Sequence, residues 1–185
     1  GISDRRSTRP DFDPPVYLPA PVAVIAGHWH GFAEPIDAQR DALLIGGKIL
    51  ISRPVAGSVR AGGGNVLLES AVGGNALLGG GRVVIGANAR VSGKATLVAG
   101  DLRIDGKIGK GMRAVARRIT IAGEIGGDAD LQASEIIILG SARIDGDLVY
   151  HSPQPIELIN ENQIGGDVAF IQSDDIEDGE EGLFA

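Results

Sequence analysis

Residues 119–138 read ITIAGEIGGDADLQASEIII, and they contain one full unit of a repeat that runs from Ile49 to Phe170. Each unit opens with a triplet whose first and third residues are aliphatic, and successive triplets are 17, 17, 19, 17, 17 and 20 residues apart. The triplets begin at Ile49, Val66, Val83, Leu102, Ile119, Ile136 and Ile156. A period this short is typical of a solenoid, in which each repeat buries its apolar face only against its neighbours.

The unit divides into three short strands. Alternation in the triplet predicts that its outer residues point inward and that its middle residue faces solvent. A second strand carries one aliphatic residue per unit, and a third strand begins with inward columns at Val59 and Ala61. Glycine follows each second strand except at Lys110, which indicates a corner that needs positive φ or close backbone approach. A small residue three places before each triplet, such as Gly46, predicts another tight corner.

Three strands and three corners in 17 residues predict one triangular coil of a single-stranded parallel β-helix. About seven coils over residues 41–172 make an all-β rod of roughly 30 Å. The longer steps fit as insertions between the first and second strands, at 86–89, 140–142 and 160–162. The left-handed hexapeptide helix is the main rival, because Ile85, Val91 and Leu97 fit its period of six. Arg103 breaks that period, although sequence alone leaves the handedness open.

Composition limits the functional classes. The chain has 185 residues, 43% of them hydrophobic, and a net charge of −7, which argues against generic nucleic-acid binding. It has no cysteine, which excludes disulfides and thiolate metal sites, and no apolar run long enough to span a bilayer. It opens with Gly1, which indicates processing or excision, so a signal peptide or transmembrane segment could lie outside it.

The flanks do not repeat. Residues 1–40 hold five prolines between positions 10 and 21, which predicts an extended arm, and also Trp29 and Phe32. We expect this arm to dock partly over the open N-terminal end of the rod as a cap. Residues 173–185 carry six carboxylates and are expected to form an acidic tail or linker.

Three groups of repeat residues are candidate interaction sites. An outward apolar ladder is formed by Leu50, Leu67 and Val84, and Phe170 stands inward in the last coil. Basic residues gather in the middle of the rod, where stacking would align some of them as a belt toward an anionic lipid surface. The belt comprises Lys94, Arg103, Lys107, Lys110, Arg113, Arg117 and Arg118.

The segments Arg117–Asp128 and Ala142–Leu148 repeat the pattern aliphatic-x-Gly followed by a polar residue. Over about residues 42–172 this pattern resembles the bactofilin family of polymer-forming bacterial cytoskeletal proteins. The resemblance implies a right-handed triangular β-helix that polymerises end to end without nucleotide, with flexible tails and frequent membrane association. The long arm and the runs Ala61–Gly64 and Leu78–Gly81 look more like bactofilin-like domains attached to bacterial membrane proteins. They favour the extracytoplasmic side of the envelope over a cytoplasmic location.

Catalytic chemistry is not indicated. His28 and His30 share one face of an extended segment, but no third metal ligand can be named. Asp128 and Asp147 occupy equivalent corner positions, which turn chemistry explains without a paired-carboxylate site. We therefore expect no enzyme and no cofactor. The sequence indicates a scaffold that associates with itself or with subunits of an envelope complex; the alternative is an accessory binding subunit of a membrane complex that does not polymerise.

Overall fold

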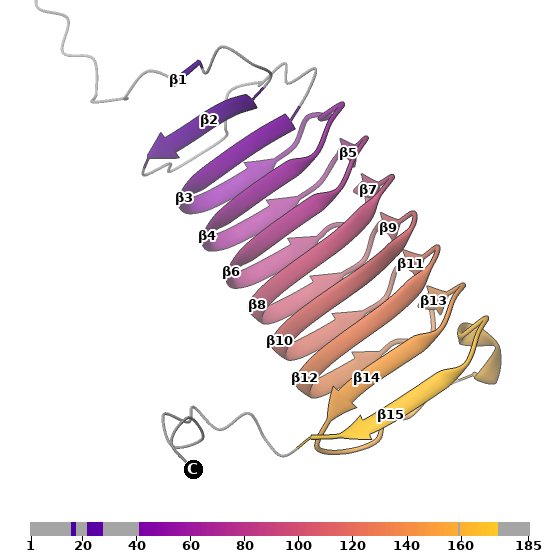
Figure 1. The fold of residues 1–185 in the computed structure, drawn as a ribbon. Helices are drawn as coiled ribbons and strands as arrows, with labels where there is room; N and C mark the ends of the chain where they lie inside the picture. The colour runs from indigo at the N-terminus through magenta and orange to yellow at the C-terminus, as the bar shows by residue number, and fades with distance from the viewer. Residues whose placement is uncertain (1–15, 18–21, 28–40, 159, 174–185) are drawn as a thin grey trace, which may run out of the picture.

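The computed structural model describes residues 16–17, 22–27, 41–158 and 160–173, and these form a parallel β-solenoid of about eight turns (Figure 1). Long strands on the near side run toward the lower left, and the segments behind return toward the upper right. Meanwhile the colour advances from indigo to yellow along the axis. The coils are therefore right-handed, as the family resemblance implied.

Each inner coil contains one long bent strand and one strand of two residues. The long strands are β3 (Asp41–Ile51), β4 (Val59–Leu68), β6 (Ala76–Ile85), β8 (Lys94–Ile104), β10 (Gly111–Ile121) and β12 (Asp128–Ile138). The short strands are β5 (Ala71–Val72), β7 (Arg90–Val91), β9 (Lys107–Ile108), β11 (Glu124–Ile125) and β13 (Arg143–Ile144). All of these pair in parallel with the equivalent strand of the next coil.

The prediction of three separate strands per coil was wrong. The third strand and the following triplet form one continuous ladder, which passes through the small-residue corner. In β10 the pairing with β12 runs from Gly111 to Ala116, omits Arg117 and resumes at Arg118. The chain turns at that one unpaired residue, because a small neighbour such as Ala116 lets the backbone bend inward without breaking the sheet.

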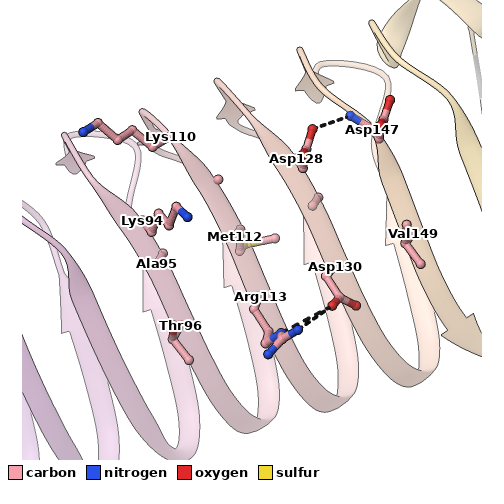
Figure 2. Close-up of a pocket in the computed structure, with 12 residues that line it drawn as sticks. Lys94, Ala95, Thr96, Lys110, Met112, Arg113, Asp128, Asp130, Asp147 and Val149 are labelled. Atoms are coloured by element: carbon pink, nitrogen blue, oxygen red, sulfur yellow. Dashed lines mark hydrogen bonds and ion pairs between the residues drawn. The ribbon is translucent and has the colours of Figure 1, made fainter.

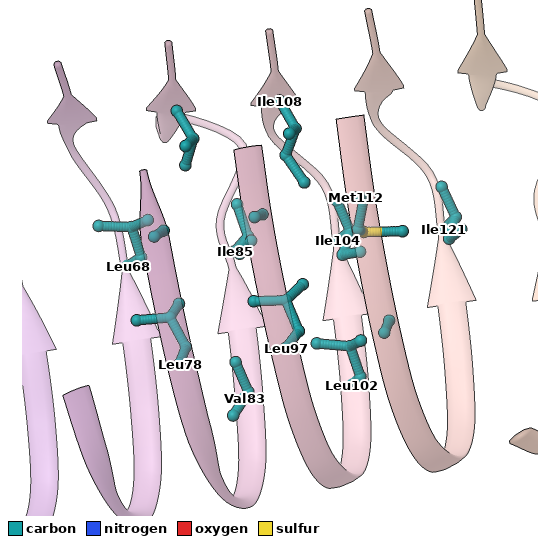
Figure 3. Close-up of a cluster of buried hydrophobic side chains, with 14 of the residues drawn as sticks. Leu68, Leu78, Val83, Ile85, Leu97, Leu102, Ile104, Ile108, Met112 and Ile121 are labelled. Atoms are coloured by element: carbon teal, nitrogen blue, oxygen red, sulfur yellow. The ribbon is translucent and has the colours of Figure 1, made fainter. Parts of the chain in front are cut away.

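The inward columns of the repeat form a single apolar core (Figure 3). Ile104 and Ile121 are fully buried, and their equivalents from Ile51 to Ile138 are at most 5% exposed, while the middle residue of each triplet lies outside the core. The longer connectors lie where they were predicted, between the long strand and the short strand that follows it. They leave the stacked ladder undisturbed, since Arg90 still pairs with Lys107 and Arg143 with Glu124.

The last coil differs from its prediction. Residues 156–158 were expected to form a triplet strand, but no strand forms there, although Ile156 and Leu158 still pack against the core. Pro153 and Pro155 precede this segment, and proline supplies no N–H to a ladder. The coil consists of β14 (Leu148–Ser152), a 3-10 turn η1 (Glu161–Gln163) and β15 (Val168–Gln172). The Gln163 side chain replaces some of the missing pairing by donating to the carbonyls of Leu139 and Ala142.

The N-terminal end has two strands more than the repeat suggested. Strand β2 (Val22–Gly27) pairs in parallel with β3, and β1 (Val16–Tyr17) pairs antiparallel with β2. Part of the proline-rich arm therefore continues the solenoid. Trp29 and Phe32, which were expected to cap it, lie outside the described residues.

Candidate interaction surfaces

A polar column marks the corner before each long strand. The Asp128 carboxylate accepts the backbone N–H of Asp147 at 2.8 Å, and Asp147 accepts that of Asp167 at the same distance. The same contact is made by the side-chain oxygens of Asp41, Ser58 and Asn75. Each accepts the backbone N–H of the equivalent residue in the next coil, at 2.7–3.0 Å. Asp128 and Asp147 thus act as backbone acceptors at a corner, which is the turn chemistry that the sequence indicated.

Most glycines of the column that follows the short strands make room for these acceptors, whereas Gly127 makes room for the backbone carbonyl of Lys110. A Cβ on Gly93 would overlap the side-chain amide oxygen of Asn75, and one on Gly146 would overlap a carboxylate oxygen of Asp128. Of the two predicted reasons for glycine, close approach is the correct one here. Among the described residues positive φ occurs at Gly111 alone, and Gly111 is not a member of this column. Lys110 can replace glycine because the preceding member of the polar column is Lys94, which has no acceptor to accommodate.

The polar column is interrupted at Lys94 and Gly111, and the surface is hollowed there (Figure 2). The depression has a volume of about 520 Å³ and spans β8, β10, β12 and β14. Lys94, Lys110 and Arg113 line its N-terminal side, and Asp128, Asp130 and Asp147 line its C-terminal side. It is an open groove rather than a closed cavity, so it is better suited to contact another surface than to enclose a small molecule.

The basic belt is largely paired with carboxylates. Three ion pairs join neighbouring coils: Lys107 with Glu124 at 3.0 Å, Arg113 with Asp130 at 3.2 Å and Arg118 with Glu135 at 2.6 Å. Arg103 pairs within its coil with Asp105. The hydrogen bond from Arg118 to Glu135, aided by charge attraction, raises the pKa of that guanidinium. The belt therefore presents less net positive charge to a membrane than its basic residues alone suggest.

The predicted apolar ladder is present. Leu50, Leu67 and Val84 lie in register on β3, β4 and β6, and each is half-buried. The structure also shows exposed apolar side chains that the sequence interpretation missed, at Ile45, Leu77 and Val98. These occupy outward positions of the third predicted strand, where only the inward alternation was considered.

The C-terminal end is an open apolar edge. Val168 and Phe170 continue inward columns whose members one coil earlier, Leu148 and Tyr150, are 0% and 4% exposed. In β15 the exposed fractions are 46% and 39%, because β15 pairs with β14 on one side and with no described strand on the other. The Phe170 ring stacks on Tyr150 with the ring centroids 5.1 Å apart.

No metal site or membrane span is found in the described part of the chain. No group of three or more His, Asp or Glu residues there could hold a metal ion, and His28 and His30 lie outside it. None of its helices is long and apolar enough to cross a bilayer. Comparisons of the chain with protein-family models, with curated proteins and with solved structures find no match.

Proposed function

We propose that this chain is a structural protein of the bactofilin type, which associates with itself through the C-terminal end of its β-solenoid and supports an assembly of the bacterial envelope. The observation that carries the proposal is the contrast between the last two coils. Equivalent side chains are buried in β14 and exposed in β15. An unpaired strand edge that also presents apolar side chains is a ready template for another chain.

A structural role is further supported by how the carboxylates are used. Asp128 and Asp147 border the depression, and each already accepts a backbone N–H of the next coil. Two of the four other charged groups that line the groove, Arg113 and Asp130, are joined in an ion pair that ties coil to coil. These side chains stabilise the rod, which is what a scaffold requires.

Replacing Phe170 with arginine should reduce assembly and leave the monomer folded. The side chain is 39% exposed and has a neighbouring coil on one side only, so a charged residue there can reach solvent. In an end-to-end contact the same charge would be buried without a partner. Sedimentation velocity and negative-stain microscopy of both proteins measure the loss.

The matched control is Ala87→Arg, which adds the same charge at an exposed position of the connector between β6 and β7, away from the end. If Phe170→Arg sediments like the unmodified chain while folded, contact through this end is wrong.

An accessory subunit of a membrane complex is the second candidate, and the N-terminal end favours it. Strand β2 covers the edge of β3, and the antiparallel β1 lies on β2. Parallel addition of another rod is therefore obstructed at this end, whereas the outer edge of β15 pairs with no described strand. A rod open at one end forms a pair or docks on a partner and does not grow into a filament.

Deleting residues 1–40 should increase self-association. The deletion removes β1 and β2 and leaves the backbone donors and acceptors of β3 unpaired, so that this edge can add another copy. Light scattering of the truncated and full chains over a range of concentrations measures the change. Deleting residues 1–15 alone, which leaves both strands, is the control. A truncated rod as monodisperse as the full chain would show that the arm does not cap the end and is better interpreted as a tether.

A further inference from the structure

The charges on one face of the solenoid are segregated along its axis. We call this the outer face; it consists of the corner residues just before each long strand, the outward residues in the first half of that strand, and their equivalents at β14 and β15. From β4 to β10 the charged residues at this face are all basic, and from β12 to β15 they are all acidic. The basic residues are Arg60, Lys94, Lys110 and Arg113, and the acidic ones are Asp128, Asp130, Asp147 and Asp167. Asp41, on β3, lies beyond the basic half.

The boundary between the two halves lies between β10 and β12, within the depression (Figure 2). Lys94 and Lys110 form no ion pair with any described residue, and Asp147 forms none either. Unpaired charges of opposite sign therefore lie on opposite sides of one line. A surface of this kind is complementary to itself when it is turned end for end.

We propose that two copies of this chain pair side by side through the outer face, with their axes antiparallel, about a two-fold axis that runs between β10 and β12. This interface is distinct from the end contact proposed above and does not depend on it. The two-fold axis places β10 opposite β12, β8 opposite β14 and β6 opposite β15 of the other copy.

Opposite charges face each other at two pairs of positions. Lys94 comes opposite Asp147 of the second copy, and Arg113 comes opposite Asp130. Since Arg113 and Asp130 already pair within each chain at 3.2 Å, the centre becomes an alternating cluster of four charges. Gly111 comes opposite Asp128 and presents no side chain of its own there.

Size matches as well. Gly79, where an added Cβ would meet no atom closer than 3.8 Å, comes opposite Ile171, which is 46% exposed. Leu77, which is 47% exposed, comes opposite Ala169 in β15. The fold does not require glycine at position 79, so a complementary surface accounts for it.

The area indicates a weak dimer. Six strands at about 4.8 Å spacing and about five residues of each strand give a face of roughly 30 Å by 15 Å. That is about 900 Å² for both copies, below the range of stable complexes, so we expect dissociation at micromolar concentration and strong sensitivity to salt.

The test uses the full chain carrying Phe170→Arg, so that the end contact does not contribute. Sedimentation velocity from about 10 µM to about 500 µM should show a monomer–dimer equilibrium whose dissociation constant rises at least about tenfold between about 50 mM and about 500 mM salt. Lys94→Asp or Asp147→Lys alone should each raise the dissociation constant about tenfold. The two-fold axis repeats every contact, so each substitution places like charges opposite one another at two points of the interface. The double variant, Lys94→Asp with Asp147→Lys, should restore the dissociation constant to within about threefold of its value before the exchange.

A steric pair of variants tests the register. Gly79→Gln should abolish the dimer by filling the space opposite Ile171, whereas Gly62→Gln should leave it intact. Gly62 has the same open surroundings and lies in β4, one strand past β15 of the second copy. A chain that stays monomeric throughout at low salt, a double exchange that does not restore pairing, or equal effects of the two glutamines would overturn the proposal. If Phe170→Arg changes no assembly but the exchange succeeds, the end contact is wrong and the lateral one stands.

Discussion

Replacing Ile121 with aspartate is expected to abolish folding. Ile121 is fully buried in the column that joins Ile104 and Ile138, and the described residues nearby offer no basic partner on the inner side. A carboxylate there would be buried without a hydrogen bond or counter-ion, at a cost of more than about 5 kcal/mol. That cost is comparable with the whole stability of a typical domain, which is about 5–15 kcal/mol.

Circular dichroism during heating should show a cooperative transition for the unmodified chain and none for Ile121→Asp. The control is Thr120→Asp, one residue away, which faces outward between Arg103 and Ile137 and should be nearly silent. Equal loss of the transition in both variants would show that the inward and outward faces have been exchanged.

Gly127→Ala is expected to destabilise the rod by about 3 kcal/mol, or a fall in melting temperature of roughly 6–12 °C. An added Cβ would overlap the carbonyl oxygen of Lys110 in the preceding coil. That oxygen belongs to the backbone, so it cannot move aside as a flexible side chain could. The neighbouring coils would have to separate locally, and the ladder through β12 would weaken.

Gly62→Ala provides the matched control, because a Cβ there meets nothing within 4 Å. It should be neutral or slightly stabilising, since alanine loses less conformational freedom on folding than glycine does. The measurement is thermal or urea unfolding of the two variants side by side. A melting temperature for Gly127→Ala within a degree of that for Gly62→Ala would mean that the coils are not packed as closely as the structure has them.

Much of the core could be predicted because side chains alternate between the two faces of a strand, so that there are only two ways to assign them inward and outward. Once Ile119 and Ile121 were both assigned inward, every equivalent residue followed by adding the repeat length, and those from Ile49 to Ile138 are buried. The bent strand could not be predicted in the same way, because a small residue such as Ala116 is compatible with both a break and a bend. The missing strand at 156–158 had a signal, Pro153 and Pro155, which the aliphatic pattern outweighed.

The interaction surfaces were harder to predict because they depend on residues one coil apart. Lys107 and Glu124 are 17 positions apart in sequence, and their pairing becomes visible only when the register of β9 and β11 is known. The segregated charges of the outer face were also overlooked, although they appear as soon as the outward residues that follow each corner are aligned. Strand β2 had a signal as well, in the continuous apolar run from Val22 to Ala26.

The unequal lengths of the strands determine how such a rod would respond to a pulling force along its axis. The hydrogen bonds between coils lie parallel to that axis, so all the bonds of one junction share the load. Inner junctions join strands such as β10 and β12, of 11 residues each, whereas β14 and β15 have 5 residues each. Under tension the rod should therefore peel from its C-terminal coil, while the middle stays intact and acts as a stiff spacer.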